Sequence, residues 1–212
     1  MLDKHNKIWE THLFTYINAE HHDIKKGALD FIYMLLDMGS KSDTAPNTKY
    51  KLYETDFRLF DRNESEEIQS IRRFCRDSVL DAVEKVNGVK KWNAEVEFRS
   101  AWAHISNNGG FHDTHAHPSC SWCGIYTIDQ GDCKLGMKNG INKFISPFST
   151  HSYRDAGTRY MAANESWEVV PMDGTLTVFP SYLLHSSWPY IGEIDRVVIS
   201  FNSRINDDLI YG

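Results

Sequence analysis

The chain has 212 residues, of which 41% are hydrophobic and 13% aromatic, and this is the composition of one globular domain with a full core. Its net charge is −6 and its basic residues form no run, which argues against nucleic acid or an anionic membrane as a partner. No apolar stretch approaches the ~20 residues that cross a bilayer. The first residues lack the apolar run of a signal peptide, and four cysteines are too few for a disulfide scaffold, so a cytoplasmic protein is expected.

The first part of the chain predicts two helices. Residues 21–39 place apolar side chains on one helical stripe that Gly39 can end: Ile24, Ala28, Phe31, Ile32, Leu35 and Leu36. In residues 63–88, Asn63 can cap a second amphipathic helix, acidic residues fill its first turn, and Asn87-Gly88 ends it. Periodicity does not decide whether residues 48–60, between the helices, form a strand or a loop.

From about residue 94, short β-rich runs replace the helical pattern. They cover residues 94–105, 123–128, 166–170, 175–180 and 196–205. Helices followed by strands predict an α+β, mainly β protein, with an all-β barrel or jelly roll buttressed by the N-terminal helices. A single domain over 1–212 is expected, with a helical part at about 1–93 and a barrel core at about 94–206. The polar stretch 129–164 is expected to form mobile loops with one hairpin, the kind of segment that acts as a lid.

Histidines crowd the segment GGFHDTHAHPSCSWCG, residues 109–124. In a strand, Asp113, His115 and His117 would share one face while His112 points away, so two imidazoles could hold one cation. The third ligand should come from a distant strand, and His185 follows a turn and an apolar strand. Imidazole suits iron, zinc, copper or nickel. Asp113 could be a further ligand or an acceptor for an imidazole N–H.

Arg196 comes eleven residues after His185 and opens the run RVVISFN. An arginine fork binds a carboxylate bidentately. Arg196 could therefore hold the far end of a dicarboxylate whose near end chelates the metal.

Two alternatives remain open from the residues. The pattern H-x-H-x-x-C-x-x-C offers His115, His117, Cys120 and Cys123 as a tetrahedral zinc site in a non-enzymatic β-barrel module. Structural zinc sites usually join two separated ligand pairs, however, and this one would leave His185 and Arg196 without a role. The other alternative is a three-histidine, cupin-type iron dioxygenase that does not use 2-oxoglutarate.

Two segments resemble the signature blocks of a group of Fe(II)/2-oxoglutarate oxygenases. They are GGFHDTHAHPSCSWCGIYTI and PMDGTLTVFPSYLLHSSWPYIGEIDRVVISFN, and the resemblance spans about residues 105–205. It implies a double-stranded β-helix and an enzyme that couples oxidative decarboxylation of 2-oxoglutarate to hydroxylation, or a related oxidation, of its substrate.

The resemblance also implies roles for particular residues. Fe²⁺ would be held by His115, His117 and His185, and 2-oxoglutarate by Arg196. In the commonest iron oxygenase triad a carboxylate stands where this chain has His117. Val198 replaces a serine found in many relatives, so Tyr126 and Asn107 are taken as further donors to the co-substrate.

The substrate cannot be read from the sequence, and a small molecule is expected. The polar 130–165 stretch suggests that it is anionic, through Lys134, Lys138, Lys143, His151, Arg154 and Arg159. A homodimer is left open. The remaining residues of interest are expected to be structural or solvated: His21, His22, His104, His112, His151 and, as a core aromatic, Trp122.

Overall fold

The computed structural model describes residues 10–42, 49–90, 93–133, 136–147, 156 and 166–206. The helices are α1 (His21–Asp37), a short 3-10 turn η1 (Leu59–Asp61) and α2 (Glu66–Asn87). The strands are β1 (Phe14–Ile17), β2 (Lys49–Glu54), β3 (Glu95–His115), β4 (Trp122–Asp129), β5 (Asn142–Ile145), β6 (Ser166–Val169), β7 (Thr175–Pro180), β8 (His185–Tyr190) and β9 (Arg196–Asn206).

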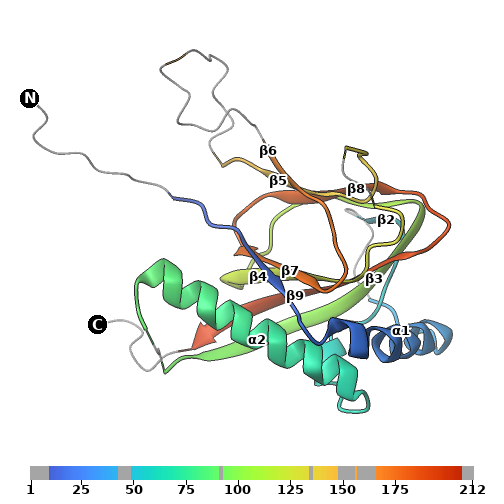
Figure 1. Ribbon diagram of the computed structural model, residues 1–212, viewed down its shortest axis with the longest axis horizontal. Helices are drawn as coiled ribbons and strands as arrows, with labels where there is room; N and C mark the ends of the chain where they lie inside the picture. Colours follow the sequence, from blue (N-terminus) through green and yellow to red (C-terminus); the bar gives the residue numbers. More distant parts are fainter. Residues whose placement is uncertain are drawn as a thin grey trace, which may run out of the picture.

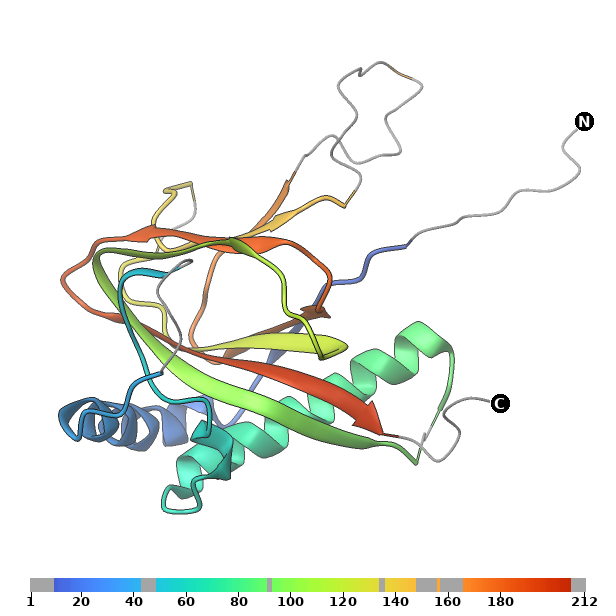
Figure 2. The same cartoon turned by 180° about the vertical axis from the view of Figure 1, so that it is seen from behind.

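One antiparallel sheet contains all of these strands and curls into an open barrel (Figures 1 and 2). Its order is β1-β7-β4-β9-β3-β8-β5-β6, and β2 pairs with β3. β9 and β8 follow each other along one edge of β3, and β2 lies along the other. The bend in β3 falls between these partners, where Asn108 and Gly109 have φ of 52° and 81°. A residue without a Cβ reaches such angles without strain, so Gly109 helps β3 to turn the corner of the barrel.

Both helices cover the outer face of the part of the sheet that contains β3, β4, β7 and β9 (Figure 1). Alternate residues of these strands face the helices and form a single apolar core with them. From the strands this core receives Ala101, Ala103, Ile105, Tyr126, Ile128, Leu176, Val178, Val197, Ile199 and Phe201. The other set of alternating side chains faces the inside of the barrel. A mainly β barrel buttressed by N-terminal helices is thus confirmed.

The predicted elements are all present in the structure, but not every boundary agrees and some strands were not predicted. Both helices are present, and all five β-rich runs become strands. Residues 48–60 divide into β2 and η1. β1, β5 and β8 were not predicted, because four to six residues of mixed polarity carry no clear period of two. None of the helices in the described ranges is long and apolar enough to span a membrane.

The start of α2 corrects one prediction. Its N-cap is Ser65 rather than Asn63, and the Ser65 hydroxyl accepts a hydrogen bond from the Ile68 amide at 3.2 Å. Both residue types can cap a helix, and only the path of the chain after η1 decides which one stands at the boundary. The C-terminal end is as expected, since Gly88 caps it with a left-handed φ of 66°.

Ser65→Ala should lower the free energy of unfolding by about 1 kcal/mol, because the Ile68 amide loses its acceptor at a buried helix end. Asn63→Ala is the matched control and should change it by less than half of that. Urea denaturation followed by circular dichroism measures both. A larger loss in Asn63→Ala than in Ser65→Ala would contradict the observed cap.

The polar stretch 129–164 is only partly described. It contains β5, which pairs with β6 and β8 on the side of the barrel away from the helices. Four of the residues named for anion binding lie outside the described residues, and with them most of the expected lid: Lys134, His151, Arg154 and Arg159.

Candidate active site

Three histidines from two distant segments meet inside the barrel. His115 ends β3, and its Cα partner in the sheet is His185 at the start of β8. His117 lies two residues past the end of β3, with its Nε2 3.2 Å from Nε2 of His185. One ring nitrogen from each of the three lies within 4.8 Å of the others. Strand pairing therefore brings together residues about seventy positions apart.

The local geometry differs from the predicted regular strand. The pairing of β3 with β8 is irregular between His112 and His115, and the strand stops before His117. The backbone amide of His117 donates instead to Ser181 at the end of β7. As a result His112 does not point away, and it lines the same cavity as His115 and His117.

Backbone carbonyls set the orientation of two of the imidazoles. Nδ1 of His115 lies 2.6 Å from the Asp113 carbonyl, and Nδ1 of His185 lies 2.9 Å from the Leu183 carbonyl. A carbonyl can only accept, so each Nδ1 carries the proton and each Nε2 presents a lone pair. This arrangement is typical of metal-bound histidines. Asp113 thus contributes its carbonyl, while its exposed carboxylate accepts from the Thr114 amide.

The three imidazoles are neutral near pH 7. Burial, helped by repulsion from His115, lowers the pKa of His185 to about 3 and that of His117 to about 4. Burial also lowers the pKa of His115. A proton does not compete with a cation for these nitrogens at neutral pH. The donor set fits Fe²⁺, for which imidazole is a suitable ligand.

The four residues of the zinc alternative do not come together in one site. Cys120 and Cys123 lie near each other, with 3.7 Å between their sulfurs, but Cys123 points to the Asn202 amide oxygen and Cys120 to the His117 carbonyl. Neither sulfur joins the imidazoles of His115 and His117 in a common cluster. The structure therefore separates the four residues of the H-x-H-x-x-C-x-x-C pattern.

Arg196 is a buried cation without an acidic partner in the described part of the chain. It is 3% exposed, and its Nη2 donates to the Asn142 side-chain oxygen at 2.9 Å. Its Nε has no hydrogen-bond partner among the described residues, and burial lowers its pKa from the usual value. A buried charge that is not paired is costly, so this guanidinium is suited to bind an anion.

The histidines and Arg196 line one cavity. The wall also includes Val198, so the position where many relatives have a serine is apolar here. Its other lining residues are Trp102, His104, His112, Cys123, Gly124, Ile125, Asn142, Phe179, Ser186, Ser187, Ser200 and Phe201.

Two predicted co-substrate residues lie elsewhere, and both predictions need correction. Tyr126 belongs to the set of β4 residues that face the helices, and its hydroxyl contacts the Asn18 amide and Nδ1 of His21. Asn107 bonds Asp195 and the Gly192 amide, so it holds the turn before Arg196 rather than a ligand in the cavity. The direction of Tyr126 follows from strand alternation, because Cys123 and Ile125 are the β4 residues that point inward.

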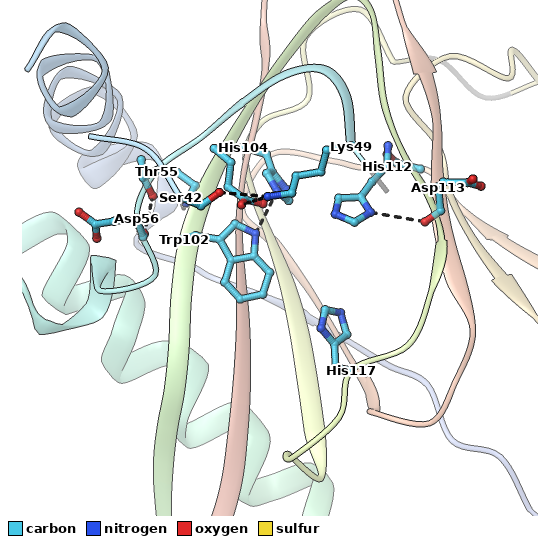
Figure 3. Close-up of polar contacts among 12 residues, drawn as sticks. Ser42, Lys49, Thr55, Asp56, Trp102, His104, His112, Asp113 and His117 are labelled. Carbon is cyan, nitrogen blue, oxygen red and sulfur yellow. Dashed lines mark hydrogen bonds and ion pairs between the residues drawn. The ribbon is translucent and has the colours of Figure 1, made fainter. Parts of the chain in front are cut away.

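The structure adds a polar cluster that the sequence did not predict (Figure 3). Nε2 of His104 lies 2.6 Å from a Glu54 oxygen, and Lys49 makes an ion pair with the same carboxylate. Burial opposes ionisation of Glu54, but the hydrogen bonds from His104 and Lys49 outweigh it and lower its pKa to about 2. His104 shares the inward face of β3 with Trp102, a signal in the sequence that could have been used. Glu54 had no such signal, because β2 was not predicted.

Comparison with known sequences matches the segment that contains this site. A sequence model of the family described as "Putative 2OG-Fe(II) oxygenase" matches residues 100–202, which include the three histidines and Arg196. The predicted family resemblance is confirmed. Glu54 lies outside the matched segment of this 2OG-Fe(II) oxygenase family. No curated protein sequence matches the chain.

Solved structures of oxygenases have the same jelly-roll fold. A prolyl-4-hydroxylase from Pseudomonas putida has a TM-score of 0.58 and 13% identity, covering 91% of this chain and 92% of that one. A prolyl hydroxylase from Trichoplax adhaerens, in complex with a hypoxia inducible factor peptide, has a TM-score of 0.61, 14% identity and coverage of 91% and 83%. The non-heme alpha ketoglutarate dependent epimerase SnoN from nogalamycin biosynthesis has a TM-score of 0.61, 11% identity and coverage of 92% and 76%.

Proposed function

We propose that the protein is an Fe(II)/2-oxoglutarate-dependent dioxygenase. In this proposal His115, His117 and His185 hold Fe²⁺, and Arg196 binds the C5 carboxylate of 2-oxoglutarate. One observation carries the proposal: three neutral imidazoles whose ring nitrogens converge, and a buried guanidinium with no acidic partner among the described residues, line the same cavity. The family match and the fold of the oxygenase structures support it.

Iron and 2-oxoglutarate, when bound, supply O₂-dependent oxidation of a substrate C–H bond, with succinate and CO₂ as products. The chain's own residues bind and orient these groups. The carbonyls of Asp113 and Leu183 keep Nε2 of His115 and His185 unprotonated and directed at the metal position. Arg196 neutralises the far carboxylate, and Asn142 keeps the guanidinium in place. We infer that hydroxylation is the outcome and that the helices and barrel, which share one core, act as a single domain.

The substrate is proposed to be a small molecule. The polar stretch does not support an anionic substrate, because its two described lysines lie on the outside of the barrel. Lys138 and Lys143 sit 4.6 Å and 5.8 Å from the ring centre of Trp188, and Lys143 alternates with the inward-facing Asn142.

Addition of 2-oxoglutarate to the anaerobic Fe²⁺ protein is expected to produce a visible metal-to-ligand charge-transfer band. Admission of air should then release succinate. Protein treated with a chelator is the control and should show neither signal. No band and no succinate, with O₂ consumed on another substrate, would instead favour the three-histidine cupin-type dioxygenase.

A further inference from the structure

The pair Cys120 and Cys123 has no role in the proposed metal site, yet the fold places the two side chains together. Their sulfurs are 3.7 Å apart, and neither is in a disulfide. A disulfide needs about 2.05 Å between the sulfurs, so the two side chains must rotate toward each other before the bond can close. Cys123 is 1% exposed and lines the cavity, whereas Cys120 is partly exposed. An outside reagent therefore reaches Cys120 first, with Cys123 positioned behind it.

The two cysteines differ in how firmly the chain holds them. Cys123 lies inside β4, between β7 and β9. Just before it, the Ser121 amide donates to the Ser203 carbonyl, and the Ser203 hydroxyl donates to the Trp122 carbonyl. Closure of the bond must therefore move mainly Cys120.

Movement of Cys120 is transmitted to His117 through the segment 117–120 and through Ser181. The preceding residue, Ser119, has a left-handed φ of 64°, and the Cys120 thiol lies 3.7 Å from the carbonyl of His117. Ser181 joins the same segment twice, because its carbonyl accepts from the His117 amide and its hydroxyl donates to the Cys120 carbonyl. A shift of Cys120 toward Cys123 would thus change the position of His117.

We propose that Cys120 and Cys123 form a modification site, a dithiol that a small disulfide such as glutathione disulfide oxidises reversibly, and that the closed bond weakens metal binding through His117. The first part stands on the cysteine geometry alone. The second part rests on the proposed function, because it requires His117 to be a metal ligand.

The chemistry balances with glutathione disulfide as the oxidant. The Cys120 sulfur, once deprotonated, attacks one glutathione sulfur, so a mixed disulfide forms and one glutathione leaves with a proton. The Cys123 sulfur then attacks Cys120, the mixed disulfide breaks, and the second glutathione leaves with the proton from Cys123. The two protein sulfurs lose two electrons, which the glutathione disulfide takes up. Excess reduced glutathione reverses both steps.

Thiol labelling tests the first part. The reduced protein is incubated in glutathione buffers of increasing oxidised fraction, quenched with N-ethylmaleimide under denaturing conditions, and analysed by intact mass and peptide mapping. The oxidised protein should lose two labels, at Cys120 and Cys123, while the buried Cys75 and Cys133 stay labelled. Cys123→Ser should stop at a glutathione adduct on Cys120. Four labels at every ratio would overturn the proposal.

Metal titration tests the second part, with Co²⁺ as the spectroscopic probe. Oxidised wild type should bind Co²⁺ at least about tenfold more weakly than reduced wild type, the lower end of the effect of disturbing a ligand's support. Cys120→Ser, treated with the same buffers, should bind like reduced wild type. Equal affinities of oxidised and reduced wild type would refute the coupling. If reduced protein binds no Co²⁺ through its histidines, the proposed function and the coupling both fail, while the labelling result still decides the redox site.

Discussion

Arg196→Ala is expected to retain Fe²⁺ and to bind 2-oxoglutarate about two to three orders of magnitude more weakly than wild type. Removal of one partner of a buried charge pair costs roughly 3–5 kcal/mol, and each 1.4 kcal/mol is tenfold in affinity. Arg196 is buried, its Nε has no partner, and no acid in the described ranges pairs with it, so the variant leaves the C5 carboxylate without a counter-charge. Iron should be retained because Arg196 is not among the clustered imidazoles.

The affinity is measured by titrating 2-oxoglutarate into anaerobic Fe²⁺ protein while following the charge-transfer band. Arg196→Lys should recover only part of the loss, since an ammonium lacks the planar fork. Arg99→Ala removes an arginine from the exposed surface and should bind normally, as should Tyr126→Phe, whose hydroxyl faces Asn18 and His21. Equal affinity in wild type and Arg196→Ala would mean that another cation holds the carboxylate.

His185→Ala should abolish stoichiometric Fe²⁺ binding. Of the three proposed ligands, the variant keeps the imidazoles of His115 and His117, which are neutral and close to the end of one strand. Loss of a ligand should weaken metal binding by more than the roughly 10–100-fold that follows from losing a ligand's supporting partner. The removed ring also packs against Phe179, so circular dichroism must confirm that the variant is folded.

Metal analysis after anaerobic reconstitution gives the measurement for His185→Ala. His22→Ala is the matched control, because the His22 side chain is fully exposed on α1, and it should bind one Fe²⁺ per chain. Cys120→Ser should also keep its iron. Unchanged iron in His185→Ala, or a stoichiometric zinc ion that only Cys120→Ser removes, would rule out the proposed metal site.

Local sequence patterns were sufficient for those features that depend on neighbouring residues. The helical stripes, the end of α2 at Gly88 and the strands β3, β4, β6, β7 and β9 were all predicted. The spacing of His115, His117, His185 and Arg196 was also sufficient to name the candidate site. Each of these depends on residue type and order along the chain, and both are properties of the sequence itself.

Only the tertiary structure decided which face each side chain takes and which distant strands meet. A strand turns consecutive side chains to opposite faces, so an uncertain register leaves the direction of a residue such as Tyr126 open. The bulge near His112 brings that ring into the cavity, and the pairing of β2 with β3 brings Glu54 to His104. The sequence by itself determined the candidate metal ligands and the candidate co-substrate cation, because these are chemical identities. Long-range strand pairing decided which residues form the cavity wall around them, and no local sequence pattern contains that information.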